Sequence, residues 1–349
     1  MKKKLSFCLL PLATTLLMSP HTLGDNHQQL EERVTALEES ILQHNKTGLA
    51  DVSFSGVIEV EASYTDADSA ESTSDLIIAT VALGVDALLT ENLSATLALL
   101  YEEDDTDLEV DIATLSYSHN DSGLSLAVGQ DYLPFGGYST VLINDPLTLE
   151  LGEIRESALV ANYQRGQFFS AFYLFNGDQD EDDRDQLTNF GARVAFVDKN
   201  FSVGADYLSN LADSDSLQDN DYGYSAGADV VDGASIYGEF TMDSVQLMLE
   251  HLRALDELAV DGNNSEPQAT HIEIAFAVDN FTYGIAYQET DEAAFLGLPE
   301  ERISIGFSTE ILSGLDLALE LVRDDDYSVA DGGTGDSANQ LVVQFAAGF

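Results

Sequence analysis

A two-residue alternation of apolar and polar side chains runs through most of the chain from residue 51 onward. It constrains the fold more than any other feature of the sequence. In one segment, for example, Phe190, Ala192 and Val194 alternate with Asn189 and Arg193. Because successive side chains of a β-strand point to opposite faces, this pattern predicts strands with one apolar and one polar face. More than a dozen such segments, each of about ten residues, are typical of a transmembrane β-barrel.

The connections between these segments alternate in length. Short turns are expected near residues 90–92, 120–121, 165–166, 198–200, 243–244, 279–280 and 313–314. Long polar segments are expected near residues 65–75, 102–109, 132–155, 176–187, 211–232, 256–268, 289–300 and 323–338. Seven turns and eight loops predict an all-β, antiparallel barrel of 16 strands over residues 51–349. A sandwich of exported sheets would also alternate, but it would not need this regular succession of short and long connections.

One further segment, residues 222–231, also alternates. We place it in a loop, because a seventeenth strand would break the even strand count of such barrels. It could instead extend the next strand or fold inward.

The N-terminus has the features of a secretory signal peptide. Lys2, Lys3 and Lys4 precede a short apolar run, and Gly24 offers a small residue for cleavage. We therefore expect a signal peptide over residues 1–24. Residues 25–50 follow, with an apolar seam spaced as in a short α-helical coiled coil and formed by Leu30, Val34, Leu37 and Ile41. The coil would lie in the periplasm and join subunits; the alternative is an amphipathic helix packed on its own domain.

The composition excludes several classes of protein. The chain has 13 lysines and arginines against 63 aspartates and glutamates, a formal net charge of −50, so it lacks the basic face of a nucleic-acid binder. Its single cysteine, Cys8, lies in the predicted signal peptide, which excludes a disulfide framework and a cysteine-based zinc site. No apolar run reaches the roughly 18 residues of a spanning helix.

The predicted strand number indicates a pore, because a barrel of 16 strands encloses more space than its side chains fill. The roughly 27 residues between the predicted cleavage site and the first strand are too few for a plug domain. Loop 132–155 is the candidate constriction, with Leu133, Pro134, Phe135 and Gly136 at its start. Its apolar content suggests burial inside the barrel mouth or at a subunit contact. The alternative is an ordinary packed loop.

Strand parity selects the candidate pore-lining residues, which are Arg193, Glu239, His271, Glu273, Arg302 and Glu320. Basic and acidic groups that face each other across a pore orient polar solutes. Arg193 and Arg302 are the candidates for an anionic ligand, since guanidinium groups pair well with carboxylates. Alternatively, these arginines only neutralise acids of the wall.

Acidic runs in the loops could bind divalent cations, but they lack the glycine and closing glutamate of a calcium-binding EF-hand loop. Solvated charge, or divalent bridging to lipopolysaccharide, accounts for them more simply, and we expect no metal site and no cofactor. A serine–histidine pair is not evident near His119, His251 or His271, so we expect no enzyme. A structural or adhesive barrel is a further alternative.

Several short blocks resemble the LbtU-type siderophore porins of Gram-negative bacteria. The blocks are Tyr132-Leu133-Pro134-Phe135-Gly136, Tyr222-Gly223-Tyr224-Ser225-Ala226, Pro267 before a strand with Glu273, Leu298-Pro299-Glu300-Glu301-Arg302, Gly333-Thr334-Gly335 and the aromatic end Phe349. The resemblance implies a plugless outer-membrane barrel that takes up ferric siderophores, although the acidity of this chain departs from an anion-selective channel. The remaining partners we expect are outer-membrane lipid, lipopolysaccharide, small polar solutes and two further copies in a homotrimer. General or cation-selective diffusion is the alternative function.

Overall fold

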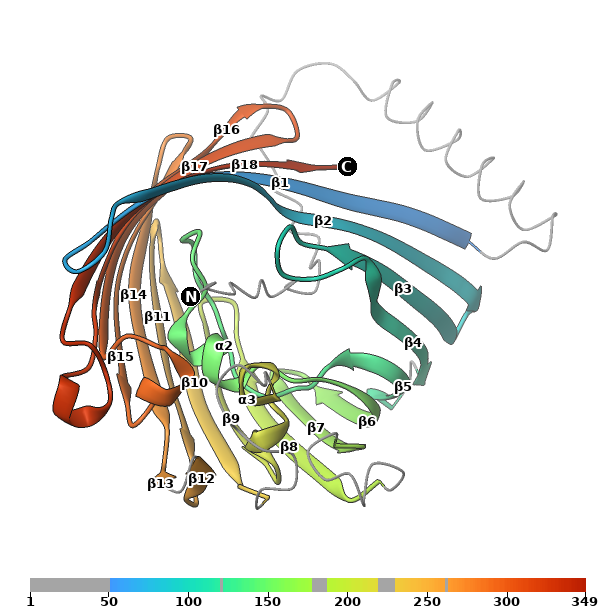
Figure 1. Cartoon of the computed structure of the whole chain (residues 1–349). Helices are drawn as coiled ribbons and strands as arrows, with labels where there is room; N and C mark the ends of the chain where they lie inside the picture. Colours follow the sequence, from blue (N-terminus) through green and yellow to red (C-terminus); the bar gives the residue numbers. More distant parts are fainter. Residues whose placement is uncertain (1–50, 120–121, 178–186, 219–229, 261–262) are drawn as a thin grey trace.

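The computed structural model describes residues 51–119, 122–177, 187–218, 230–260 and 263–349. In these ranges, 16 antiparallel strands follow one another around a closed barrel, and β1 meets β18 to complete it (Figure 1). The fold class predicted from the alternation is therefore confirmed. The predicted signal peptide and the predicted coil of residues 25–50 lie outside the described residues.

The barrel strands are β1 (Asp51–Ala67), β2 (Thr73–Thr90), β3 (Leu93–Tyr101), β4 (Glu109–His119), β5 (Leu124–Tyr132), β6 (Arg155–Arg165), β7 (Phe168–Phe175), β8 (Asn189–Val197), β9 (Phe201–Leu208), β10 (Gly233–Met242), β11 (Val245–Ala254), β14 (Gln268–Val278), β15 (Phe281–Asp291), β16 (Glu301–Leu312), β17 (Leu315–Asp325) and β18 (Ser337–Gly348). The connections hold α2 (Leu147–Gly152), α3 (Asp215–Gln218), the short 3-10 helices η1 (Leu211–Asp213), η3 (Ala294–Leu296) and η4 (Val329–Asp331), and a hairpin of β12 (Leu258–Val260) and β13 (Asn263–Ser265). Among these helices, none has the length and hydrophobicity needed to cross a membrane.

Six of the seven short turns lie where the sequence predicts them, and the predicted turn at residues 120–121 lies outside the described residues. Two of them place an aspartate, Asp243 or Asp279, in the left-handed backbone region at φ 54°, which short polar side chains tolerate better than most. The hairpin β12–β13 was not predicted, because strands of three residues are too short for an alternation to be recognised. Most of segment 222–231 lies outside the described residues, and its last two residues precede β10.

Strand register separates an outer apolar face from an inner polar one. Phe190 and Val194 on β8 are exposed on the outside, whereas Arg193 between them points inward to Asp206 on β9. On β17, Leu321 is exposed and its neighbour Glu320 is fully buried inside. This matches the parity read from the sequence.

The barrel closes at its C-terminal strand. Residues 57–67 of β1 pair with residues 338–348 of β18. The amide of Gly56 donates to the carbonyl of Phe349, and the amide of Phe349 donates back to the carbonyl of Gly56. A Cβ at position 56 would lie 2.5 Å from the tip of the Phe349 ring, so glycine at this position leaves room for the terminal side chain beside β1.

The connection between β5 and β6, which we call the inserted loop (residues 133–154), folds into the barrel rather than away from it. Figure 1 shows its helix α2 within the ring of strands, and α2 contacts β11, β14 and β15. Its leucines 147 and 151 join a buried apolar cluster with Phe175, Leu208 and Leu252 of the wall. Burial in this cluster accounts for the apolar composition that is unusual in an external loop.

Candidate functional site

The inserted loop is held to the inner wall by carboxylates from four strands. Asp206 of β9, Glu250 of β11, Glu273 of β14 and Glu320 of β17 all accept hydrogen bonds from backbone amides of the loop. The distances are 2.8 Å for Gly136 N to Asp206, 2.7 and 2.8 Å for Gly137 N and Tyr138 N to Glu250, 2.9 Å for Val141 N to Glu273, and 2.7 and 2.8 Å for Ile143 N and Asn144 N to Glu320.

These contacts supply hydrogen-bond acceptors for backbone amides of the inserted loop. Residues 136–144 belong to no strand or helix, so their amides have no ladder partner, and a buried amide without an acceptor is costly. An ionised carboxylate accepts two or more such bonds and binds each more strongly than a neutral group does. Side chains add to this set, since Thr148 and Ser235 also donate to Glu250, at 3.0 and 2.9 Å.

Two glycines of the wall make room for the tip of the loop. A Cβ at Gly284 of β15 would lie 2.9 Å from side-chain carbons of both Val141 and Leu142. A Cβ at Gly306 of β16 would lie 2.9 Å from Leu142 and 2.7 Å from the backbone oxygen of Leu319. The loop tip therefore rests on a stretch of wall that has no side chains of its own.

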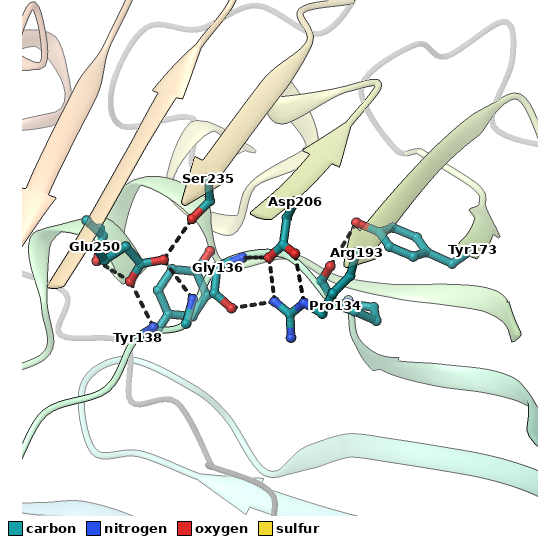
Figure 2. A network of polar contacts seen from close by, with 10 residues as sticks. Pro134, Gly136, Tyr138, Tyr173, Arg193, Asp206, Ser235 and Glu250 are labelled. Carbon is teal, nitrogen blue, oxygen red and sulfur yellow. Dashed lines mark hydrogen bonds and ion pairs between the residues drawn. The ribbon is translucent and has the colours of Figure 1, made fainter. Parts of the chain in front are cut away.

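Arg193 links this docking to the wall. Its Nε and Nη2 donate to the two carboxylate oxygens of Asp206 at 2.9 and 2.6 Å, and Nη2 also donates to the carbonyl of Gly136 (Figure 2). The guanidinium lies 5.2 Å from the centre of the Tyr237 ring, a cation–π contact. Among the described residues, its Nη1 has no hydrogen-bond partner.

A cavity of about 120 Å³ opens beside this arginine, beneath residues 136–139 of the loop. Arg193, Tyr237, Glu239 and His271 line it. Glu239 accepts from Gln246 Nε2 at 2.8 Å and keeps part of its surface exposed. The cavity thus has a cation at one side and a carboxylate at another.

His271 is the least satisfied group of this cavity. Its side chain is 2% exposed, and neither ring nitrogen has a hydrogen-bond partner. Nε2 lies 3.3 Å from Glu273 Oε2, near enough for an ion pair but not aligned as a hydrogen bond. The ring thus lines the cavity with hydrogen-bonding capacity that the described residues do not use.

The other two largely buried arginines are also paired. Arg302 of β16 donates from Nε and Nη2 to Asp324 of β17, at 2.8 and 3.2 Å. Arg155, at the start of β6, lies 2.6 Å from Glu109 and 3.0 Å from Asp111. Each basic group meets its acid on a neighbouring part of the wall rather than across the lumen.

On its other side the inserted loop carries closely spaced acidic side chains. Asp145, just before α2, is buried, and one of its carboxylate oxygens has no hydrogen-bond partner. Burial raises the pKa of the Asp145 carboxyl well above its usual range, and the nearby charges of Glu150, Glu153 and Glu102 raise it further. Acids of the loop thus lie close to acids of the wall.

The structure brings together three of the six candidate pore-lining residues, Arg193, Glu239 and His271, in the cavity beneath Gly136. Glu273 and Glu320 instead bind the loop backbone, and Arg302 lies apart with Asp324. Leu133 and Phe135 belong to the apolar cluster, and the carbonyl of Pro134 accepts from Tyr173.

Two residues that hold the loop, Asp206 and Glu250, were not among the candidates from the sequence. Both stand at inward positions of alternating strands, so the parity that selected Glu239 and Glu273 could have selected them too. In the part of the chain that the structure describes, no three His, Cys, Asp or Glu side chains are grouped as a metal site would require.

Comparison with known proteins gives distant relatives. The chain is 28% identical over 225 residues to a UPF0422 protein of Coxiella burnetii, covering 58% of this chain and 48% of that protein. It is 23% identical over 329 residues to a UPF0422 protein of Legionella pneumophila strain Paris, covering 83% of this chain and 62% of that protein. The chain therefore spans about half to two thirds of these relatives. No family model matches it.

Solved structures share the fold. The outer membrane channel DcaP of Acinetobacter baumannii superposes with a TM-score of 0.64 at 16% identity, covering 87% of this chain and 98% of that one. OmpF of Salmonella typhi gives 0.65 at 12% identity, covering 86% and 98%. The trimer form of OmpT, an outer membrane protein of Vibrio cholerae, gives 0.54 at 14% identity, covering 86% and 100%. At these identities the likeness establishes the 16-stranded porin fold.

Proposed function

We propose that this protein is a diffusion channel of the outer membrane that passes small polar solutes and prefers cations to anions. The observation that supports the proposal is the inserted loop, which lies inside a closed 16-stranded barrel and binds the polar inner face of its wall. Barrels of this size enclose water unless a segment fills them. The porin fold of the structural neighbours supports the same function.

Cation preference follows from the charge distribution. The three largely buried arginines each pair with a carboxylate, so they offer a passing anion little net positive charge. The whole chain carries a formal net charge of −50, and acidic runs such as Glu103, Asp104 and Asp105 lie in its loops. A negative lumen raises the local concentration of cations, and added salt screens the effect.

Reversal-potential measurements in a planar bilayer with a KCl gradient test this proposal. The expected result is a conductive channel whose cation preference is strong at low salt and declines as salt rises. Anion preference would contradict the electrostatic argument. A folded, inserted barrel without conductance would favour a structural or adhesive role instead.

Uptake of ferric siderophores is a second candidate, supported by the resemblance of the sequence blocks. Arg193 and Arg302 would contact an anionic ligand only while also paired with Asp206 and Asp324. A neutral or cationic ferric siderophore therefore suits this lumen better than an anionic one. Unchanged growth of a gene deletion on such a siderophore as sole iron source, with no second receptor present, would leave general diffusion as the function.

The remaining proposals concern processing and assembly. We propose that residues 1–24 are removed on export, that residues 25–50 lie in the periplasm, and that three copies associate as in the trimer form of OmpT. Lipopolysaccharide would surround the loop end of the barrel, and no catalytic role is proposed. Native mass spectrometry of the full-length protein in mild detergent checks the trimer, and a purely monomeric particle would contradict it.

A further inference from the structure

We propose that the cavity beneath residues 136–139 is a binding subsite for small zwitterionic solutes of the amino-acid class. The inference deepens the proposed channel function and rests on it, since the solute would reach the site through the lumen. The site is built from three walls: Arg193 on β8, Glu239 on β10 and His271 on β14, with loop backbone above them.

The carboxylate of the solute would bind at Arg193. Two of the three guanidinium nitrogens are committed to Asp206 and to Gly136, which fixes the plane of the group (Figure 2). The third, Nη1, has no partner among the described residues, although Arg193 lines the cavity. A fixed guanidinium with one free donor is preorganised for a carboxylate oxygen, because no side-chain freedom is lost on binding.

The ammonium group of the solute would bind between Glu239 and His271. Glu239 keeps a partly exposed carboxylate that accepts from Gln246 at 2.8 Å and, with its other oxygen, from Ser139 at 3.4 Å. His271 lines the same cavity with a side chain that is 2% exposed, and neither of its ring nitrogens has a hydrogen-bond partner among the described residues. Buried polar atoms without partners are rare and call for a group that satisfies them. A neutral imidazole accepts one N–H, and a carboxylate accepts another.

Other ligand classes fit less well. A simple anion would accept a hydrogen bond from Nη1 of Arg193. It would also lie near the carboxylate of Glu239, and the carboxylates of Asp206 and Glu250 are close to the same cavity, so it would be repelled. A metal ion lacks a set of three ligands in the described residues. A cavity of about 120 Å³ holds a solute of a few heavy atoms rather than a siderophore. A solute that carries both a carboxylate and an ammonium group complements the guanidinium and the carboxylate that line this cavity.

Ligand-observed NMR titration of the full-length barrel, folded in detergent, tests the site without requiring conductance. Three probes of similar size separate the possibilities: L-alanine is a zwitterion, lactamide is neutral, and L-alaninamide is a cation. We expect saturable binding of L-alanine, and binding of the other two at least on the order of tenfold weaker. Equal binding of L-alaninamide would mean that only the acids act, and it would overturn the proposal.

Matched variants locate the binding. Glu239→Gln and His271→Gln should each weaken L-alanine binding by on the order of tenfold, the usual loss for one charge-assisted contact. Asp86→Asn removes an equal charge from the lumen face of β2, where Asp86 accepts from Thr96, and it should leave the affinity within about twofold. Equal weakening by all three substitutions would mean that the overall negative potential of the lumen, and not this cavity, accounts for the binding. Absence of L-alanine binding to the folded wild type would refute the site. Both results would leave the KCl conductance, and with it the channel function, standing.

Discussion

At the residue scale, one chemical group serves two purposes in this barrel. Glu273 and Glu320 are predicted from the sequence to meet solutes, yet both hold backbone amides of the inserted loop, as Glu250 also does. Glu239, which lines the cavity, accepts from side chains of Gln246 and Ser139 rather than from backbone amides of the loop. A carboxylate on the inner wall of a barrel should therefore be interpreted as a solute-binding group only if no nearby backbone amide donates to it.

Replacing Glu320 with glutamine tests this docking role. One oxygen of Glu320 accepts both Ile143 N and Asn144 N, so loss of its charge should weaken loop docking by ~1–2 kcal/mol. Hydrogen–deuterium exchange at residues 143–144 should become faster, while the strands stay protected. Asp316→Asn on the same strand, where Asp316 is exposed, is the control. Unchanged exchange in Glu320→Gln would mean that apolar packing alone holds the loop.

Glu102, directly after β3, gives the molecule a dependence on pH. Burial raises the pKa of this carboxyl from 4.5 to about 7, and the charges of Asp105 and Asp111 add to the effect. The unfolded chain thus releases this proton at lower pH than the folded barrel, so stability falls as pH rises from 4.5 to about 7.

Glu102→Gln should therefore raise the thermal unfolding midpoint in detergent at pH about 8 and leave it nearly unchanged at pH about 4. Asp104→Asn, an exposed substitution in the same loop, should not alter the pH dependence. A Glu102→Gln variant that is less stable than the wild type at both pH values would show that the hydrogen bond from Thr106 outweighs the burial of charge.

At the scale of elements, the inserted loop and the wall beneath it are complementary in volume as well as in charge. The side chains of Val141 and Leu142 pack against the wall at Gly284 and Gly306, which have no side chains. At the other end of the loop, α2 packs into the apolar cluster. The loop is thus fixed at both ends and at its middle. The wall therefore fixes the position of the loop, which needs little rigidity of its own.

Gly284→Leu should push the loop tip toward the lumen axis and lower the single-channel conductance, because the new side chain meets Val141 and Leu142. Adding Leu142→Ala frees comparable volume and should restore much of the conductance. Gly348→Leu, at a position with nothing within 4 Å, is a control for glycine replacement in a strand. Equal conductance in all variants would place the narrowest point elsewhere.

At the scale of the whole molecule, the outer apolar face predicts how the barrel sits in lipid. Leu321 lies in the middle of β17, whereas Leu317 is two residues from its turn end. The cost of a charge facing lipid depends on depth, at ~2–4 kcal/mol near the midplane and ~0–1 kcal/mol near the interface. Leu321→Lys should therefore destabilise the barrel in lipid vesicles by clearly more than Leu317→Lys does.

Denaturant titrations of folding into vesicles measure both costs on the same scale. The order is the critical result, because both substitutions introduce the same charge on the same strand face. A larger cost for Leu317→Lys would mean that the turn end lies deeper in the bilayer than the middle of the strand, which would contradict the inferred placement of the barrel.

The sequence by itself determined the strand number, the turn positions and the face on which each strand residue lies. These properties are local, since a period of two and a pair of turn residues are read within a dozen positions. It also marked residues 132–155 as unusual, because leucines in a polar connection need burial. The hairpin β12–β13 escaped notice because its strands are too short to show a period.

Only the tertiary structure decided what the inward-facing charges do. The loop amides meet carboxylates that are 70 to 177 positions away, as in Gly136 with Asp206 and Ile143 with Glu320. No local pattern encodes such pairs, because parity gives a direction but not a partner. Parity brought Arg193, Glu239 and His271 to the inner wall, but their meeting at one cavity depends on the stagger of β8, β10 and β14 around the barrel and on a loop that folds over them. That arrangement exists only once the sheet has closed.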